Sequence, residues 1–265
     1  MSNKRDPFER FRNATRARIG LGRAGDALPT AAILDFQLAH ARARDAVHGS
    51  VDFAVLAKEL APAPTIRIRS CAKDRTIYLA RPDLGRQPLA ADLPVPGERY
   101  DIAFVIADGL SASAVERHAV PLFKACMKRL DGFSVAPVIL GEQARVAFGD
   151  EAAAAFGAEI AIVLIGERPG LSVPDSLGAY ITFRPQSGRR DSERNCISNI
   201  HANGLSYEIA ADKIVWIVRE ALRLQLTGVD LKENADRSEK ALFERTPRER
   251  DQSSDHSADG ALETN

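Results

Sequence analysis

Three continuous apolar runs stand out in the pattern of hydrophobic and polar positions. They cover residues 102–107, 135–140 and 160–165. Strands that are buried on both faces of a parallel sheet lose the usual alternation of apolar and polar residues, because helices cover both sides. Each run is therefore predicted to be a central strand of one sheet.

Each of these runs ends in a glycine beside an acidic residue. The acids are Asp108, Glu142 and Glu167. Open α/β sheets bind ligands beyond the carboxyl ends of their strands, so the three acids are expected to share one binding rim. We single out Glu167, because the guanidinium group of Arg168 follows it directly at the strand end. The pattern does not identify the ligand, and a solvated loop glutamate without a role is the simpler alternative.

Apolar residues at helical spacing predict further helices around these strands. The first follows Pro29 and ends at Gly49, and the second is predicted to be capped by Ser50 and to end before Pro62. Other helices are predicted at 111–130, 150–156 and 208–226.

Shorter patterns predict four more strands, at 66–69, 76–80, 179–184 and 196–200. The alternation of strands and helices predicts an α/β fold with a Rossmann-like, mostly parallel, doubly wound sheet. A small helical unit precedes this sheet in the chain.

The chain is predicted to have three parts. An arginine-rich arm and the helical unit occupy residues 1–64, the α/β domain occupies 65–232, and a polar tail occupies 233–265. The tail has few apolar residues and many charged residues and serines, so we expect it to be disordered. The arm is either a solvated segment or a segment that docks on an acidic partner surface.

Composition and charge narrow the classes of function. The 265 residues carry 36 basic and 36 acidic side chains, so no overall attraction to nucleic acid or to an anionic membrane is expected. No apolar run approaches the ~20 residues of a membrane span, and the charged N-terminus does not resemble a secretory signal. An intracellular protein is therefore predicted. The three cysteines are far apart and predict free thiols, and no spacing of histidine and cysteine predicts a metal site.

One glycine motif indicates a different class of protein. Gly20, Gly22 and Gly25 match the G-x-G-x-x-G pattern of dinucleotide-binding units, and Asp45 follows about 20 residues later. The segment before the motif is rich in arginine, whereas the pattern requires an apolar strand there. An NAD-type oxidoreductase is therefore kept as the alternative function, and a purely structural adaptor is a third hypothesis.

The sequence contains no self-sufficient catalytic motif. It lacks a P-loop, a deaminase zinc signature and a recognisable Ser-His-Asp arrangement. We therefore predict no catalytic residue and no metal ligand in this chain. The residue pattern favours a ligand-binding module.

Five short strings resemble, in the same order, the small (light) subunit family of ethanolamine ammonia-lyase. They are RIGLGRAG from Arg18, ADGLSA from Ala107, RVAFGD from Arg145, IGERPGL from Ile165 and RNCISNI from Arg194. The resemblance covers roughly residues 15–232. It implies an adenosylcobalamin-dependent lyase that converts ethanolamine into acetaldehyde and ammonia. A TIM-barrel large subunit would hold the substrate, and the small subunit, inactive alone, would close over the cofactor at their interface.

The resemblance also implies which residues bind the cofactor. The cobalamin-contacting positions of the family fall on Val146, Glu167 and Cys196, and the residue types match. A corrin ring is fringed with amides, whose N–H groups need acceptors once they are buried. The Glu167 carboxylate is such an acceptor, Val146 supplies apolar contact, and Cys196 contributes its backbone or its small side chain. The 65–232 segment is then expected to be a cobalamin-binding domain.

A second cobalamin motif offers an alternative ligand for the cobalt. Asn199, His201 and Gly204 come within one residue of an Asp-x-His-x-x-Gly signature whose histidine binds the metal. Asparagine here replaces the aspartate that would orient the imidazole and make it more basic. We therefore expect the cofactor to keep its own dimethylbenzimidazole on the cobalt.

The resemblance implies a cytoplasmic protein, and it leaves open a location inside a bacterial microcompartment. The arginine-rich arm would then dock on the large subunit or serve as an address for the compartment. Nucleic acid and membrane are not expected as partners.

Overall fold

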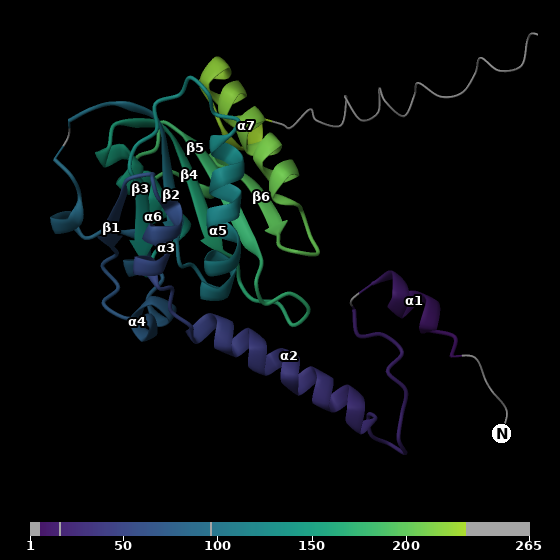
Figure 1. Cartoon of the computed structure of the whole chain (residues 1–265). Coiled ribbons are helices and arrows are strands. Elements are labelled where there is room, and N and C mark those ends of the chain that lie inside the picture. Colours follow the sequence, from purple (N-terminus) through teal and green to yellow (C-terminus); the bar gives the residue numbers. More distant parts are fainter. Residues whose placement is uncertain (1–5, 16, 96, 232–265) are drawn as a thin grey trace, which may run out of the picture. The chain divides into compact units, whose positions relative to one another are not determined.

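A six-stranded sheet forms the centre of the protein, with the strand order β1-β3-β2-β4-β5-β6 (Figure 1). The computed structural model describes residues 6–15, 17–95 and 97–231. The strands are β1 (Thr65–Arg69), β2 (Tyr100–Ala107), β3 (Val138–Glu142), β4 (Ala158–Gly166), β5 (Leu177–Phe183) and β6 (Asn195–Ile200).

The sheet is mixed, which corrects part of the prediction. β1, β3, β2 and β4 run parallel, whereas β5 is antiparallel to β4 and β6 is antiparallel to β5. A parallel neighbour needs a crossover of about a dozen residues or more, usually a helix, and only residues 167–176 connect β4 to β5. The α/β class is confirmed, but the Rossmann-like, doubly wound arrangement is not.

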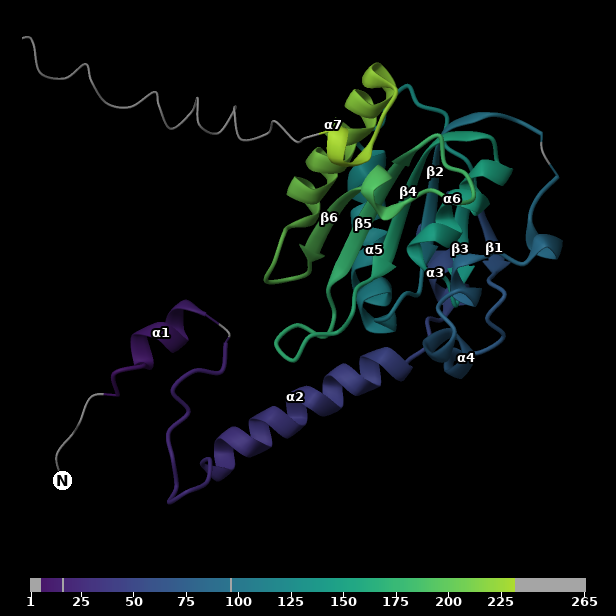
Figure 2. The same ribbon diagram turned by 180° about the vertical axis from the view of Figure 1, so that it is seen from behind.

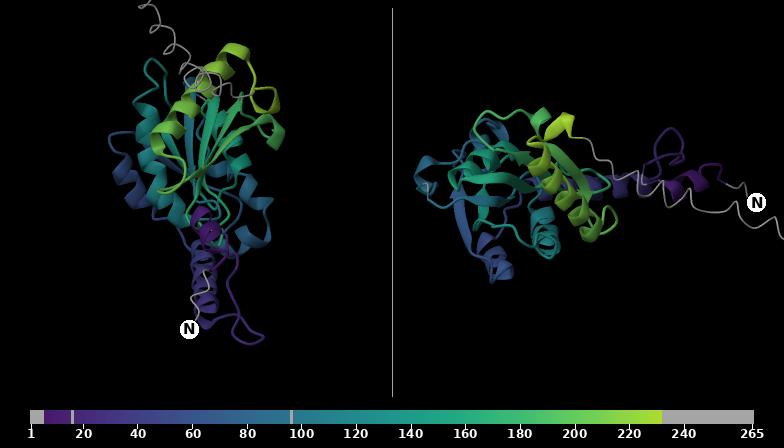
Figure 3. Two further views of the ribbon diagram at one scale, coloured as in Figure 1. Left: turned by 90° about the vertical axis from the view of Figure 1, so that its right-hand side faces the viewer. Right: turned by 90° about the horizontal axis from the view of Figure 1, so that it is seen from above.

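Helices cover the two faces of the sheet unequally (Figures 2 and 3). One face packs against α3 (Phe53–Leu60), α5 (Ala112–Met127) and α7 (Tyr207–Leu224). The other face packs against α6 (Val146–Ala155), which contacts β2, β3 and β4. The remaining helices are α1 (Glu9–Ala14), α2 (Thr30–His48) and α4 (Arg75–Ala80), with 3₁₀ segments η1 (Leu84–Arg86), η2 (Ala90–Asp92), η3 (Asp191–Glu193) and η4 (Gly228–Asp230).

Alternate residues of the central strands point into the two layers. Phe104 and Ile162 lie in the layer with α5, whereas Val105 and Val163 lie in the layer with α6. All four side chains are fully buried. Burial on both faces explains why the sequence shows continuous apolar runs at these strands.

Local capping decides where the helices begin. The predicted helices at 30–48 and 111–130 are confirmed as α2 and α5, and the Ser111 hydroxyl accepts the Ala114 N–H (3.3 Å) at the start of α5. The predicted cap of α3 is wrong. Asp52, and not Ser50, accepts the N–H groups of Ala54 and Val55 (3.0 and 3.1 Å).

The strand predicted at 76–80 is wrong, because this segment forms α4. The Asp74 carboxylate accepts the Ile77 N–H (2.8 Å) and caps the helix. Tyr78 is buried between the guanidinium groups of Arg75 and Arg145, which lie 4.7 and 4.3 Å from its ring centroid. The cap and these tertiary contacts override the strand preference of the short apolar segment.

Two other boundaries differ from the prediction. β3 begins at Val138, because Pro137 cannot donate a hydrogen bond to the sheet, and Val135 forms only an isolated bridge to Ile102. α6 begins at Val146 and not at Asp150. Val146 is therefore the first residue of this helix.

Loops partly cover the two outer strands. The Leu89 N–H donates to the Arg69 carbonyl (2.7 Å), so the segment around Pro88 pairs with the end of β1. The Asn195 side chain donates to the Leu231 carbonyl (2.8 Å), so the segment after α7 lies at the start of β6. β6 also contains a bulge near its end, where Asn199 has a φ of 63°.

The early glycine motif does not have the surroundings of a dinucleotide site. In the described residues, the first strand along the chain is β1, well after the glycines, and α2 begins only at Thr30. Gly20 and Gly25 lie in a loop with φ values of 57° and 64°. The NAD alternative is therefore not supported.

Among the described helices, none combines the length and apolar content that crossing a membrane would require. The predicted disordered tail, 233–265, lies outside the described residues.

Candidate functional site

The three acids at the strand ends have different surroundings and do not form one rim. Asp108 is buried, and its carboxylate accepts the N–H groups of Gln143 and Ala144 (both 2.9 Å). Burial raises the pKa of Asp108 to about 6, although these donors and Arg75, at 3.8 Å, oppose the shift. Asp108 therefore holds the turn between β3 and α6 and has no open side for a ligand.

This raised pKa predicts a pH dependence of stability. The native state binds the Asp108 proton more tightly than the unfolded state does, so the stability contributed by this group is full below about pH 4 and is lost as the pH rises through 6. The shift corresponds to about 2–3 kcal/mol. We expect the difference in free energy of unfolding between wild type and Asp108→Asn to fall by this amount from about pH 4 to pH 7. Urea denaturation measures it, and a constant difference would contradict the raised pKa.

Glu142 lies at the pairing of β3 with β1. Its carboxylate forms an ion pair with Arg67, and Arg69 is its register partner on β1. Glu142 therefore supports the pairing of these two strands. Of the three acids, Glu167 is left as the candidate ligand-binding residue.

Glu167 directly follows β4 and is half-buried. Its Oε2 accepts hydrogen bonds from the Ser176 hydroxyl and from the Asn199 N–H (3.4 Å). Within the described residues, no group donates to Oε1. One carboxylate oxygen thus fixes the side chain, while the other is available to accept a hydrogen bond from a ligand.

Tyr180 and Cys196 lie beside Glu167 in the sheet. Cys196 of β6 pairs in register with Tyr180 of β5, and Tyr180 pairs with Val163 of β4. Val163 and Tyr180 both belong to the layer with α6, so Cys196 points to that face as well. A Cβ on Gly178 would lie 3.1 Å from Glu167 Oε1 and 3.3 Å from the Tyr180 ring, which places these two side chains together.

The raised pKa values of Tyr180 and Cys196 keep the tyrosine hydroxyl and the cysteine thiol protonated. Burial raises the pKa of Tyr180, and Cys196 and Glu167 raise it further. Partial burial also raises the pKa of the exposed Cys196 thiol, although Tyr180 opposes the shift. Tyr180 is therefore a hydrogen-bond donor, and Cys196 is a weak nucleophile because the thiolate is the reactive form.

Val146 lies on the same face of the sheet. It is the first residue of α6 and packs, partly buried, against the layer under that helix. On β6 the neighbouring side chains Cys196 and Ser198 are exposed. We call the surface formed by Val146, Glu167, Gly178, Tyr180 and Cys196 the open face. All three predicted cofactor-binding residues lie on this face, which extends from the strand ends onto the sheet.

Sequence reasoning missed Gly178 and Tyr180. Both occupy alternate positions of β5, and residues at such positions share one face of a sheet. The alternation would have indicated them only if one face of β5 had been known to lack a helix. Because helices were expected on both faces of the sheet, the alternation in β5 did not indicate an open face.

A buried ion pair joins α6 to the chain that enters β6. Arg194 Nη2 binds the carboxylate of Asp150, and both side chains are only 1% exposed. Burial raises the pKa of Asp150, and Arg194 opposes the shift. Because Asp150 lies one turn after Val146 and Arg194 lies two residues before Cys196, the pair fixes both sides of the open face relative to each other.

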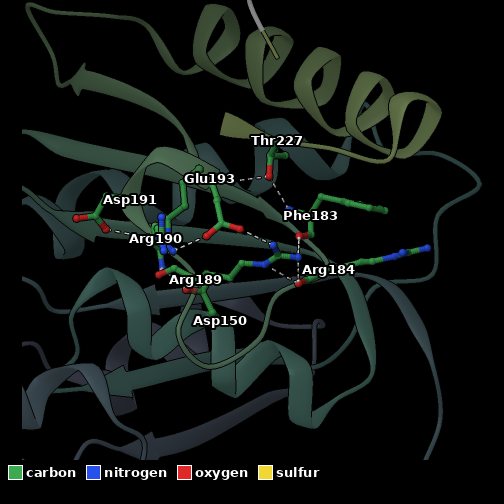
Figure 4. A network of polar contacts seen from close by, with 9 residues as sticks. Asp150, Phe183, Arg184, Arg189, Arg190, Asp191, Glu193 and Thr227 are labelled. Atoms are coloured by element: carbon green, nitrogen blue, oxygen red, sulfur yellow. Dashed lines mark hydrogen bonds and ion pairs between the residues drawn. The ribbon is translucent and has the colours of Figure 1, made fainter. Parts of the chain in front are cut away.

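Hydrogen bonds order the loop between β5 and β6, and Figure 4 shows the contacts of Arg189 and Glu193 near Asp150. Arg189 donates to the Arg184 carbonyl (2.9 Å) and to Glu193 Oε1 (2.5 Å). Arg194 donates to the Arg189 carbonyl (2.9 Å) and to Asp191 (2.8 Å). The start of β6 is therefore held by side chains from its own loop as well as by α6.

His201, the alternative cobalt ligand, uses both ring nitrogens within its own loop. Nε2 lies 2.9 Å from Asn199 Oδ1, and Nδ1 accepts the Asn203 N–H (3.3 Å). This arrangement places the proton on Nε2 and leaves no free lone pair for a metal. In the described part of the chain, no group of three or more histidine, cysteine or acidic side chains is arranged to hold a metal ion.

Comparison with known proteins assigns the chain to one family. The model of the ethanolamine ammonia-lyase light chain (EutC) family matches residues 5–232. The ethanolamine ammonia-lyase small subunit of Azotobacter vinelandii is 50% identical over 242 residues, which cover 87% of this chain and 90% of the relative.

Two further relatives carry the same name. The small subunit of Xanthomonas campestris pv. campestris is 50% identical over 244 residues, covering 88% of this chain and 90% of the relative. The small subunit of Pseudomonas syringae pv. tomato is 48% identical over 241 residues, covering 87% and 84%. The chain therefore belongs to the ethanolamine ammonia-lyase light-chain family, whose members are lyase subunits.

Proposed function

We propose that this chain is the small subunit of an adenosylcobalamin-dependent ethanolamine ammonia-lyase and that its open face covers part of the cofactor. The observation that carries the proposal is that Val146, Glu167 and Cys196, which are far apart in the sequence, lie on one face of the sheet. A TIM-barrel large subunit would hold the substrate and the rest of the cofactor. The reaction would convert ethanolamine into acetaldehyde and ammonia.

The residues of the open face fit a wide, amide-fringed ring. Glu167 Oε1 offers an acceptor to an amide N–H, and the Tyr180 hydroxyl offers a donor to an amide carbonyl. Gly178 lacks a side chain between them, and Val146 adds apolar surface at the start of α6. A broad ligand can therefore lie flat against this part of the sheet.

The chemistry is divided between the cofactor and the two subunits. Adenosylcobalamin supplies radical chemistry when it is bound, and proteins orient such cofactors and exclude water. In this chain, Ser176 and Asn199 orient Glu167. The Asp150–Arg194 pair links α6, which carries Val146, to the start of β6, which carries Cys196. None of these residues is assigned a catalytic step, so the isolated chain is expected to be inactive.

Glu167→Ala tests the proposed cofactor contact. Loss of a buried acceptor costs about 1–3 kcal/mol, so the affinity of the two-subunit complex for adenosylcobalamin should fall by about 10-fold. Equilibrium dialysis with cyanocobalamin gives a second measurement that does not depend on turnover. Glu142→Ala is the matched control, because Glu142 is also a strand-end glutamate but pairs with β1. Equal affinities for wild type and Glu167→Ala would contradict the proposed site.

The subunit assignment has a separate test. The chain should turn over ethanolamine only when it is combined with its large subunit and adenosylcobalamin. Turnover by the purified chain alone would contradict the proposal. We also propose that His201 does not bind the cofactor's cobalt, because both of its ring nitrogens have partners within its own loop. A spin-resonance spectrum showing a histidine nitrogen on the metal would overturn this.

The proposed location is the cytoplasm or the interior of a bacterial microcompartment. A lyase that releases acetaldehyde, a reactive aldehyde, is suited to enclosure. Fluorescent labelling of the chain in cells with and without compartment shells distinguishes the two locations.

A further inference from the structure

The first half of α2 exposes an unusual amount of apolar surface. Within α2 only Ala46 is buried. Large apolar side chains near the start of the helix are between 38% and 58% exposed, and they are Leu28, Ile33, Leu34, Phe36 and Leu38. Scattered exposed apolar residues are ordinary, but a contiguous group of this kind marks an interaction surface.

These side chains point to more than one side of the helix. Successive residues of an α-helix are rotated by about 100°, so Ile33, Leu34 and Phe36 point in three different directions. A helix on the surface of a monomer usually has one apolar stripe, so a wider exposed apolar surface indicates that a partner covers it. A partner that covers only one stripe would leave the other side chains in water. The partner must therefore cover more than one side of the first half of α2, while the exposed Asp35 and Gln37 can lie at the edge of the contact.

The second half of α2 has a different character. It carries Arg42, Arg44 and Asp45, which are all exposed, and it reaches the rest of the protein where Gly49 ends the helix. The apolar first half is thus bordered by charged residues. An apolar centre with a polar rim is the usual organisation of a protein–protein interface.

α2 lies next to the loop that begins with Glu167. A hollow of about 290 Å³ is lined by Leu38 and Arg42 of α2 and by Leu171 and Pro174 of the β4–β5 loop. A partner seated on α2 therefore also reaches the loop whose first residue belongs to the open face. The hollow therefore connects α2 to the loop that links β4 to β5.

We infer that α2 is the docking surface for the large subunit, which covers the apolar first half of the helix. This inference rests on the proposed function. The family match includes residues 5–232 and hence all of α2, so the helix is part of what defines this subunit. The matched relatives are named small subunits, and a large subunit is the partner that this name requires.

The test uses the full chain combined with its large subunit. Leu34→Glu with Leu38→Glu places two charges on the covered part of α2 and is expected to raise the dissociation constant of the subunits at least about 100-fold. Val55→Glu with Ile209→Glu is the matched control, since these side chains are 47% and 51% exposed on α3 and α7. The control should stay within about threefold of wild type. Circular dichroism and thermal unfolding of each isolated chain show that the variants fold.

Leu34→Ala with Leu38→Ala is a milder variant. The inference is supported if this variant loses less affinity for the large subunit than the glutamate variant does, but more than the control. Normal binding of the glutamate variant would overturn it. A second result would also overturn it. If the isolated wild-type chain self-associates, and the glutamate variant loses this self-association but still binds the large subunit, then a second copy of the chain occupies α2. If wild type itself fails to bind the large subunit, the proposed function fails and this inference fails with it.

Discussion

Replacing Arg194 with alanine is expected to lower the free energy of unfolding by about 3–5 kcal/mol. The substitution leaves the Asp150 carboxylate buried without its guanidinium partner, in a site where both side chains are 1% exposed. It also removes the donor to the Arg189 carbonyl, which orders the loop before β6. Urea denaturation followed by circular dichroism measures the change.

Asp191→Ala is the matched control for this experiment. Asp191 pairs with the same Arg194, but its side chain is 85% exposed, and exposed ion pairs contribute only about 0–1 kcal/mol. A double variant with Asp150→Leu and Arg194→Met separates charge from packing, because a well-packed apolar pair can replace a buried ion pair with little loss. A loss below about 1 kcal/mol in Arg194→Ala would show that water reaches Asp150 and that the pair is not a rigid link.

Replacing Phe148 with alanine is expected to cost about 3–5 kcal/mol as well. Phe148 is a fully buried residue of α6, and its ring fills the space above Gly141, where a Cβ would meet it at 2.8 Å. The substitution leaves a cavity between the helix and β3. Thermal and urea unfolding should show the loss.

Phe148→Leu controls for the loss of the ring itself. It keeps most of the volume, so its cost should be about 1.5 kcal/mol or less. Because Phe148 lies two residues after Val146, the alanine variant should also weaken cofactor binding through a loosened α6, whereas the leucine variant should not. Equal stability of the alanine variant and wild type would mean that α6 does not depend on this contact.

The central elements of the fold could be predicted because their signals are local. The apolar run of β4 and the helical spacing of α5 are each contained in one stretch of sequence. The direction of β5 could not be read from its residues, because apolar runs look alike in parallel and antiparallel strands. The short connection at 167–176 did contain the information, since it leaves no room for a crossover helix.

The strand predicted at 76–80 failed for a different reason. A segment this short has no decisive periodicity, and the Asp74 cap and the packing of Tyr78 between two arginines select the helix. The partners of Tyr78 include Arg145, which is far away in the sequence. No local pattern could have indicated that contact.

The candidate site was predictable only in part. Asp108 and Glu167 have the same kind of sequence signal, a strand that ends in an acid beside a glycine, yet one is buried against backbone N–H groups and the other faces an open surface. The difference depends on which turn packs against each strand end. Tyr180 was missed because its importance comes from its neighbours across β4 and β6.

The covered outer strands have a consequence for the behaviour of the unassembled subunit. An unpaired strand edge is a template for sheet extension and aggregation, and a chain that awaits a partner is exposed to this hazard. The segment around Pro88 pairs with the end of β1, and the bulge at Asn199 interrupts the outer strand β6. These two features limit edge-to-edge pairing of the sheet while the apolar surface of α2 is not covered by a partner.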